Sequence, residues 1–300
     1  MAPKQPTEEL VRTVEEHLGR RGIRWRRPHT GLSPAQRFVV TLDDGESVFV
    51  KAAVDAQTER WLRTDHLMLS TLAGFVPEVV AWIDAGAHPV LVIEDLHDGH
   101  WPADHNPVQW KRGQWELLFE TLERVAATPA PASLPSLADL YEPQWSQIAA
   151  DPEPFMALEI CSRGWLERSL EQLVAAEAAL DLSGDALVHN DVRSDNVCFR
   201  GDRVILVDWS DTRRGSSRHD LANVLSLCQL EQGPEPHAIM PDGGSFAAWH
   251  GGILARRALA GDAPKWLTAV FKRGAILCLQ WAGRCLDLTP WDGKAWREVR

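Results

Sequence analysis

One polar loop, which lies between short apolar runs, constrains the possible folds of this chain more than any other feature. The loop covers residues 189–196, with the sequence HNDVRSDN, and it lies between the apolar runs 186–188 and 197–199. A second apolar run, 204–207, leads directly into Asp208. Short apolar runs bounded by polar residues are typical of buried β-strands. The sequence therefore predicts an H-x-D-x-x-x-x-N loop between strands, followed by a strand that ends in an aspartate.

This pattern resembles the catalytic loop and metal site of kinases, in which an aspartate receives the proton of the substrate hydroxyl. The resemblance implies that Asp191 is the catalytic base and that Asn196 and Asp208 are metal ligands. An amide carbonyl and a carboxylate are oxygen ligands that suit Mg²⁺. Only four asparagines occur in the chain, and two of them lie in this loop. That concentration weakens the alternative, an ordinary solvated turn.

Composition narrows the class of protein. The net charge of −11 speaks against a nucleic-acid binder and suits a cationic small substrate, although most of it serves solubility. The five cysteines are odd in number and lack C-x-x-C spacing, which predicts buried thiols in a reducing cytoplasm. The N-terminus is polar and no apolar stretch is long enough for a membrane span, so we expect a cytoplasmic protein without a leader.

The order of the predicted elements is β-rich first and helical afterwards. Asp-Gly between two alternating apolar runs is a strong hairpin signal, and it occurs at residues 44–45. We expect a helix over 5–19, strands over 37–42, 47–51, 79–83 and 90–93, and a helix over 56–73. Further helices are predicted over 107–127, 165–180, 218–230, 245–259 and 264–286.

The chain resembles the aminoglycoside phosphotransferase and choline kinase group, small-molecule relatives of the protein kinases, from about Gly31 to Asp220. The resemblance implies an α+β, bilobal protein-kinase-like fold. Its small β-rich lobe, residues 1–96, would bind the nucleotide, and its larger, mainly helical lobe, residues 97–300, would carry catalysis and acceptor binding. The kinase D-F-G triplet is written Asp208-Trp209-Ser210 here, and nothing like A-P-E follows. A protein kinase is therefore not expected.

The same resemblance assigns the nucleotide site. Lys51 ends an apolar run, as the phosphate-binding lysine of kinases does. Its carboxylate partner is expected on the following helix, where Asp65 is preferred over the nearby Glu59. Gly31 and Ser33 lie in a short loop that would offer backbone N–H groups to phosphates, although an ordinary turn explains this loop equally well.

The segment from Glu94 to Leu96 resembles the hinge whose backbone binds adenine. Arg193 has two equal interpretations: it stabilises charge on the transferred phosphate, or it forms a salt bridge to Asp195. Asp220 is interpreted as a structural brace of the catalytic loop.

The function predicted from these residues is an ATP- and Mg²⁺-dependent kinase that phosphorylates a hydroxyl of a small, possibly cationic molecule. An antibiotic acceptor is preferred, and a metabolic one (choline, homoserine or a sugar amine) is the alternative. A nucleotide-binding pseudoenzyme is a further alternative, disfavoured because the set of site residues is intact. Candidate acceptor contacts lie in the helical part: Asp211, Glu231, Glu235 and Trp281.

Overall fold

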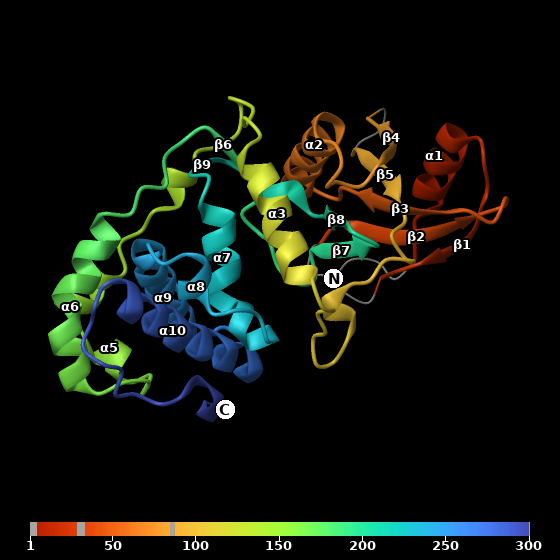
Figure 1. Cartoon of the computed structure of the whole chain (residues 1–300). Coiled ribbons are helices and arrows are strands. Elements are labelled where there is room, and N and C mark those ends of the chain that lie inside the picture. The colour runs from red at the N-terminus through yellow and green to blue at the C-terminus, as the bar shows by residue number, and fades with distance from the viewer. Residues whose placement is uncertain (1–4, 29–33, 85–87, 300) are drawn as a thin grey trace. The chain divides into compact units, whose positions relative to one another are not determined.

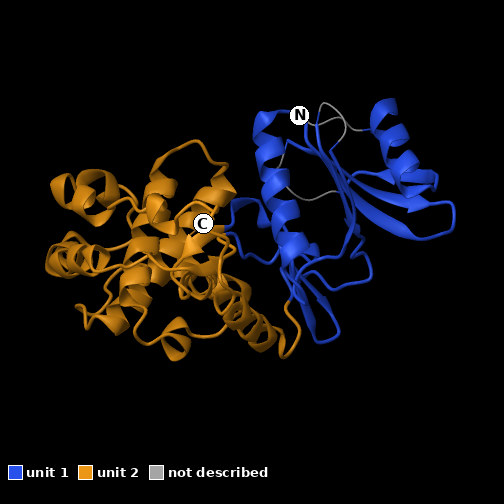
Figure 2. Cartoon of the chain, turned by 90° about the horizontal axis from the view of Figure 1, so that it is seen from above, with its two compact units in different colours: residues 1–109, 191–212 blue, residues 110–190, 213–300 orange. Residues whose placement is uncertain are grey.

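The structure, a computed structural model, describes residues 5–28, 34–84 and 88–299. The chain divides into two compact units (blue and orange in Figure 2). Unit 1 comprises residues 1–109 and 191–212, and unit 2 comprises residues 110–190 and 213–300. This division differs from the predicted boundary at residue 96, because unit 1 also contains residues 97–109 and residues 191–212, that is, the polar loop from Asp191 onward and the two strands that follow it. The roles assigned to the two predicted lobes stay predictions.

Unit 1 is built on a five-stranded antiparallel sheet with the strand order β1-β2-β3-β5-β4 (Figure 1). A separate hairpin, β7–β8, and the helices α1 and α2 complete it. The bounds are α1 Glu8–Leu18, β1 Gly22–Arg26, β2 Gln36–Leu42, β3 Ser47–Ala52, α2 Ala56–Thr71, β4 Val79–Ile83, β5 Val90–Glu94, β7 Val197–Arg200 and β8 Arg203–Leu206, with short 3-10 helices at Pro102–Asp104 and Trp209–Asp211.

The two faces of this sheet differ in chemistry. Leu10 and Val14 of α1 pack against alternate residues of β2 and β3, among them Val40 and Val50, and form one apolar core. Successive side chains of a strand point to opposite faces. Lys51, next to Val50, therefore projects from the other face of the sheet, away from α1.

Unit 2 is mainly helical, and its core lies around α9 and α10, which run side by side (Figure 1). Its one described two-stranded sheet pairs β6 with β9. The bounds are α3 Gln114–Ala126, α4 Trp145–Ala150, α5 Glu153–Met156, α6 Arg163–Ala178, β6 Ala186–Val188, β9 Arg213–Gly215, α7 His219–Leu227, α8 Pro236–Ile239, α9 Gly244–Leu259 and α10 Lys265–Cys285, with 3-10 helices at Leu137–Leu140, Cys228–Glu231 and Trp296–Glu298. The α+β class predicted from the sequence is confirmed.

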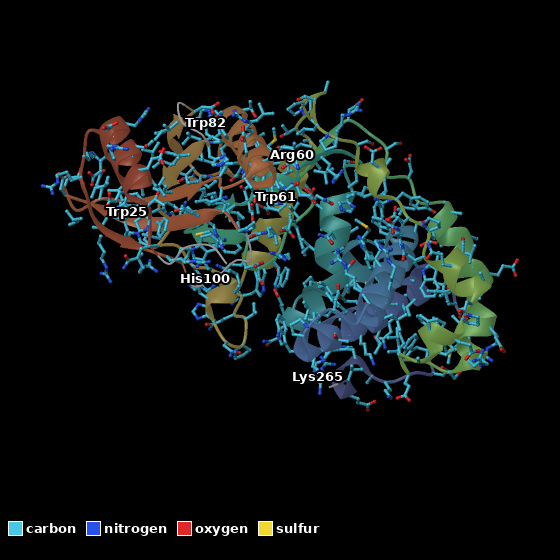
Figure 3. All side chains as sticks on the ribbon, turned by 180° about the vertical axis from the view of Figure 1, so that it is seen from behind. Trp25, Arg60, Trp61, Trp82, His100 and Lys265 are labelled. Carbon is cyan, nitrogen blue, oxygen red and sulfur yellow. The ribbon has the colours of Figure 1, made fainter. Side chains whose placement is uncertain are left out.

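The tryptophans serve mainly as packing residues. Trp145, Trp165 and Trp281 are almost fully buried in the core of unit 2. Trp281 also donates its indole N–H to the backbone oxygen of Met240 at 3.2 Å, so the structure does not support it as an acceptor contact. Trp61, labelled in Figure 3, is an exception at the surface, where it is 37% exposed.

The C-terminal segment closes one end of unit 2. Asp292 accepts hydrogen bonds from the backbone N–H of Ser162 (3.2 Å) and from its hydroxyl (2.6 Å) at the start of α6. Trp291 packs edge-on against Trp165, with ring centroids 4.7 Å apart. Residues close to the chain end therefore complete the packing of an internal helix.

Strand β1 and the start of helix α3 are among the points at which the structure differs from the sequence prediction. β1 lies in an arginine-rich stretch that was not predicted as a strand; backbone pairing with β2 forms it, with Trp25 opposite Val40. The helix predicted from residue 107 begins only at Gln114. Gly113, at its N-cap, has φ 84°, a left-handed conformation that glycine adopts without strain.

The cysteines and the helices bear on two expectations from the sequence, buried thiols and the lack of a membrane span. All five cysteines are free, and Cys198, Cys228 and Cys278 are buried. Within the described ranges, none of the helices combines the length and the apolar character needed to cross a bilayer.

The close packing around Gly252 on α9 and the open space around Gly283 on α10 predict opposite effects for two glycine substitutions. A methyl group at Gly252 would lie 2.5 Å from Cβ of Gln144, whereas one at Gly283 meets no atom within 4 Å. We expect Gly252→Ala to lower the free energy of unfolding by about 1–3 kcal/mol through overpacking. Gly283→Ala should raise it by about 0.5–1 kcal/mol through helix propensity. Urea denaturation measures both, and equal effects would contradict the packing described.

Candidate active site

Lys51 and Asp65 form a buried ion pair in unit 1. The Nζ of Lys51, on β3, lies 2.6 Å from Oδ2 of Asp65, on α2, and the Asp65 side chain is only 2% exposed. Glu59, the alternative partner, instead pairs with Arg63 at 2.8 Å. The structure thus selects Asp65, whose helix carries it to Lys51 on the face of the sheet opposite α1.

The position of α2 follows from its sequence. Asp55 accepts a hydrogen bond from the backbone N–H of Thr58 at 2.8 Å, and Thr58 Oγ1 accepts one from the N–H of Asp55 at 3.0 Å. This reciprocal capping box fixes the first turn of the helix. Leu62, Met68 and Asp65 are buried on one side of α2. The carboxylate of Asp65 is therefore carried on the packed side of the helix.

Asp65 also holds the backbone that follows Asp208. Its second oxygen, Oδ1, accepts the N–H of Trp209 at 3.1 Å. Trp209 is fully buried, its ring lies 5.9 Å from that of Phe75, and its indole N–H donates to the backbone oxygen of Leu206 at 2.8 Å. One carboxylate thus joins the lysine on β3 to the chain just beyond β8.

Asp208 adopts a left-handed backbone conformation, with φ 65° and ψ 62°. Such a conformation costs a residue with a side chain roughly 1–3 kcal/mol and is commonest at functional sites. The carboxylate is 41% exposed, lies 3.9 Å from Nζ of Lys51 and accepts a hydrogen bond from Ser210 Oγ at 3.0 Å. It is therefore accessible and held beside a cation.

Electrostatics keep Lys51 charged. Burial alone would lower the pKa of Lys51, but the carboxylates of Asp65 and Asp208 outweigh it and raise that pKa above its ordinary value. A protonated lysine that is largely removed from water is suited to binding an anion.

Asn196 and Asp191 are joined directly. The amide Nδ2 of Asn196 donates to the backbone oxygen of Asp191 at 2.9 Å and to its carboxylate at 3.0 Å. The amide carbonyl oxygen is the end of Asn196 that is chemically able to bind a metal ion, and its role as a metal ligand stays a prediction. Burial raises the pKa of Asp191 to about 6; Asp208 and Asp195 add to this effect, whereas Arg193 and Asn196 oppose it. A carboxylate with this pKa is suited to general base catalysis near neutral pH.

Arg193 contacts both carboxylates of its loop. Its Nε lies 3.3 Å from Asp191 and 3.2 Å from Asp195, and its side chain is 54% exposed. The salt bridge to Asp195 is thus present, and the same guanidinium lies beside the predicted base. Its role in catalysis stays a prediction.

The backbone before Asp191 is braced within unit 2. Asp220, at the start of α7, accepts the N–H groups of His189 (2.7 Å) and Asn190 (2.9 Å). Burial raises the pKa of Asp220 to about 6, and the two N–H groups oppose this rise. The side chain of Asn190, which has φ 68°, lies 3.0 Å from Nε2 of His219. Asp220 thus makes the bracing contacts expected of it.

The remaining residues predicted to bind the nucleotide are Gly31, Ser33, Glu94 and Leu96. Gly31 and Ser33 lie outside the described residues. The carboxylate of Glu94 is engaged by Arg200 at 2.5 Å and by the N–H of Glu78 at 2.9 Å. The backbone oxygen of Leu96 accepts from the indole of Trp101 at 3.2 Å. The Glu94 side chain therefore binds Arg200 and the backbone of Glu78. Adenine binding by the backbone of residues 94–96 stays a prediction.

The donor set fits a magnesium ion that is held mainly by its substrate. Asp208 offers a carboxylate and Asn196 an amide oxygen. In the part of the chain that the structure describes, no three His, Cys, Asp or Glu side chains cluster as a metal cage. Mg²⁺ is commonly held by one or two carboxylates together with substrate phosphates and water, so a cage is not required.

Arg37 is a residue of this region that the sequence reasoning missed. It lies on β2 directly opposite Lys51 of β3. The Asp-Gly signal located the turn, but the register needed the loop length: the loop has three residues, 43–45, with Leu42 hydrogen-bonded to Glu46, and counting back from that pair places residues 37 and 51 together.

Known proteins resemble this chain in sequence family and in fold. The family model of the phosphotransferase enzyme family matches residues 24–259. A search of curated proteins gave no match. Among solved structures, a thermostable mutant of aminoglycoside phosphotransferase APH(4)-Ia, in complex with AMP-PNP and hygromycin B, is 15% identical and has a TM-score of 0.59, covering 92% of this chain and 99% of that chain.

Two further structures share the fold. A choline/ethanolamine kinase family protein from Mesorhizobium loti is 16% identical with a TM-score of 0.56, over 88% of this chain and 91% of that one. ADP-bound aminoglycoside phosphotransferase APH(2'')-Ib is 12% identical with a TM-score of 0.51, over 92% and 99% of the two chains. The predicted kinase-like fold is confirmed by these similarities. Since the family model spans most of its length, the chain belongs to the phosphotransferase enzyme family.

Proposed function

We propose that this protein transfers the γ-phosphoryl group of ATP, in the presence of Mg²⁺, to a hydroxyl of a small molecule. The observation that carries the proposal is the carboxylate of Asp65, which binds both Lys51 and the backbone next to Asp208. A phosphate-binding cation and a metal ligand are thereby held in one arrangement. The complexes of similar structures with AMP-PNP and ADP support ATP as the donor.

Each residue has a defined part in the proposed reaction. Lys51 binds phosphate oxygens, while Asn196 and Asp208 hold the metal ion. When bound, Mg²⁺ supplies positive charge against the phosphoryl oxygens. Asp191 orients the acceptor hydroxyl and takes up its proton on a carboxylate oxygen. Arg193, which contacts Asp191, stabilises charge on the group in transfer. Catalysis then consists of positioning and electrostatic stabilisation.

An antibiotic of the aminoglycoside type is the acceptor that we favour. The similar structure in complex with hygromycin B and the net charge of −11, which attracts cations, support this choice. The similarity to a choline/ethanolamine kinase family protein supports a metabolic amino alcohol as the second candidate.

The test is ADP release with ATP and Mg²⁺ across a panel of acceptors: aminoglycosides, peptide and nucleoside antibiotics, choline, homoserine and sugar amines. We expect release that depends on one class of acceptor. Asp191→Asn should lower kcat for that acceptor by roughly a hundredfold or more, because the proton acceptor is lost. Asp202→Asn, at the exposed β7–β8 turn, is the matched control and should retain the wild-type rate.

The panel also separates the alternatives. ATP binding without transfer to any acceptor would favour the pseudoenzyme. A near-normal rate in Asp191→Asn would contradict the role of Asp191 as the base.

Metal dependence can be tested by binding. Asp208→Ala should abolish the part of ATP affinity that depends on Mg²⁺, because the exposed carboxylate ligand is removed. Calorimetry with and without Mg²⁺ measures this part, and Asp202→Ala serves as the control. Undiminished Mg²⁺ dependence in Asp208→Ala would place the metal elsewhere.

The pKa of Asp191 predicts an acid limb in the pH profile. Below about pH 6 the free enzyme carries a protonated Asp191, which cannot accept the hydroxyl proton. The value of kcat/KM should therefore fall roughly tenfold per pH unit below that point. Asp220 titrates in the same range. Asp220→Asn should keep the acid limb at a reduced rate, and loss of the limb in this variant would assign it to Asp220.

A further inference from the structure

The backbone oxygen of Glu94, at the end of β5, lacks the donor that a regular sheet would supply. The N–H of Glu94 donates to the backbone oxygen of Glu78 at 2.9 Å. In a regular antiparallel ladder, two residues paired in this way exchange both hydrogen bonds. Here the N–H of Glu78 donates instead to Oε1 of the Glu94 side chain, also at 2.9 Å. The backbone oxygen of Glu94 is therefore left without its donor from the ladder.

The backbone N–H of Leu96 is a second group with unused capacity. Leu96 is only 6% exposed, and among the described residues none accepts a hydrogen bond from its N–H. Buried backbone N–H groups are nearly always paired, with protein, ordered water or a ligand. An acceptor is therefore expected to arrive at this N–H from outside the described chain.

The other two carbonyl groups of the segment 94–96 are occupied. The guanidinium of Arg200 donates to the backbone oxygen of Asp95 at 2.6 Å. The backbone oxygen of Leu96 accepts two N–H groups, from the backbone of Gly99 at 3.0 Å and from the indole of Trp101 at 3.2 Å. A carbonyl oxygen has two lone pairs, so the capacity of the Leu96 oxygen is used in full.

The packing of Trp101 fixes its indole in this position. Its ring packs against the small apolar cluster that contains Leu96 and Cys198. The preceding residue, His100, exchanges two backbone hydrogen bonds with Phe199 of β7, each 2.9 Å long. The donor of Trp101 is thus held at the Leu96 oxygen by contacts that do not depend on the indole N–H itself.

The pattern of available groups distinguishes the two purines. Along its Watson–Crick edge adenine has a donor, the 6-amino group, next to an acceptor, N1, whereas guanine has an acceptor, O6, next to a donor, N1–H. The oxygen of Glu94 and the N–H of Leu96 match the order of adenine. Guanine can pair with the N–H of Leu96 only through O6, and its N1–H then requires the oxygen of Leu96, which is already occupied.

We propose that the backbone of residues 94–96 selects adenine over guanine nucleotides, and that Trp101 enforces this choice by occupying the oxygen of Leu96. The inference rests on the proposed function and on the prediction that this segment binds the base; it adds the selectivity and the residue that sets it. A buried hydrogen-bonding group of the ligand that is left unpaired lowers affinity by roughly tenfold or more.

The test is calorimetry with the full chain and Mg²⁺, with ADP, GDP and inosine diphosphate (IDP) as ligands. The base of IDP has the O6 and N1–H of guanine but lacks its 2-amino group. We expect both GDP and IDP to bind roughly tenfold or more weakly than ADP, because both carry the wrong edge. IDP that binds as tightly as ADP would show that the 2-amino group is read instead, and would overturn the inference.

Trp101→Phe tests the indole, because a phenyl ring keeps the packing and lacks the N–H donor. The ratio of the GDP and ADP dissociation constants should fall roughly threefold or more, with ADP affinity within about twofold of the wild type. Trp291→Phe is the matched control, because its indole also donates to a backbone oxygen, that of Lys294, at 3.1 Å. A merely structural role of Trp101 would weaken both nucleotides equally, so an unchanged ratio would overturn the inference.

Failure of the selectivity can be told from failure of the proposed function. Equal affinities of the wild type for ADP and GDP, together with ADP release that depends on an acceptor, would overturn the selectivity and leave the proposed transfer intact. A wild-type protein that binds none of the three nucleotides would overturn both.

Discussion

The buried ion pair between Lys51 and Asp65 is the interaction on which the candidate site depends. Removing two charges from water is costly, and a buried pair is tolerated when its remaining hydrogen-bonding capacity is satisfied. Here the second oxygen of Asp65 accepts the N–H of Trp209. A strand, a helix and the segment after β8 are thereby fixed by one side chain. Asp65 is shorter than a glutamate, so α2 must lie close to β3 for this contact to form.

Much of this arrangement could be predicted because it is encoded locally. The loop around Asp191, the strand that ends at Asp208 and the hairpin before Lys51 each follow from residues adjacent in the sequence. Their pattern sufficed to predict the fold and the phosphotransferase class, and both predictions are confirmed. The preference for Asp65 over Glu59 rests on the helical register, and in the structure it is Asp65 that contacts Lys51. The roles of these residues in binding and catalysis stay predictions.

The features that escaped prediction depend on partners distant in sequence or on backbone conformation. β1 carries Arg24 and Arg26 in the pattern of a solvated segment, and only its pairing with β2 makes it a strand. Arg37 lies opposite Lys51 only through the pairing of β2 with β3. Trp281 was a reasonable aromatic contact by composition, but helix packing buries it. Composition and periodicity do not report which face of a helix another helix covers.

The division of the chain into units has a consequence for its synthesis. Unit 1 needs residues 191–212, which follow 81 residues of unit 2, and Asp292 near the chain end contacts the start of α6. A nascent chain that has emerged only to residue 109 lacks the β7–β8 hairpin and the partner of Asp65 at residue 209. Domains that are continuous in sequence can fold one after another on the ribosome. In this protein, neither unit can be completed until segments that are synthesised late have emerged. The partly synthesised chain therefore needs protection from aggregation until then.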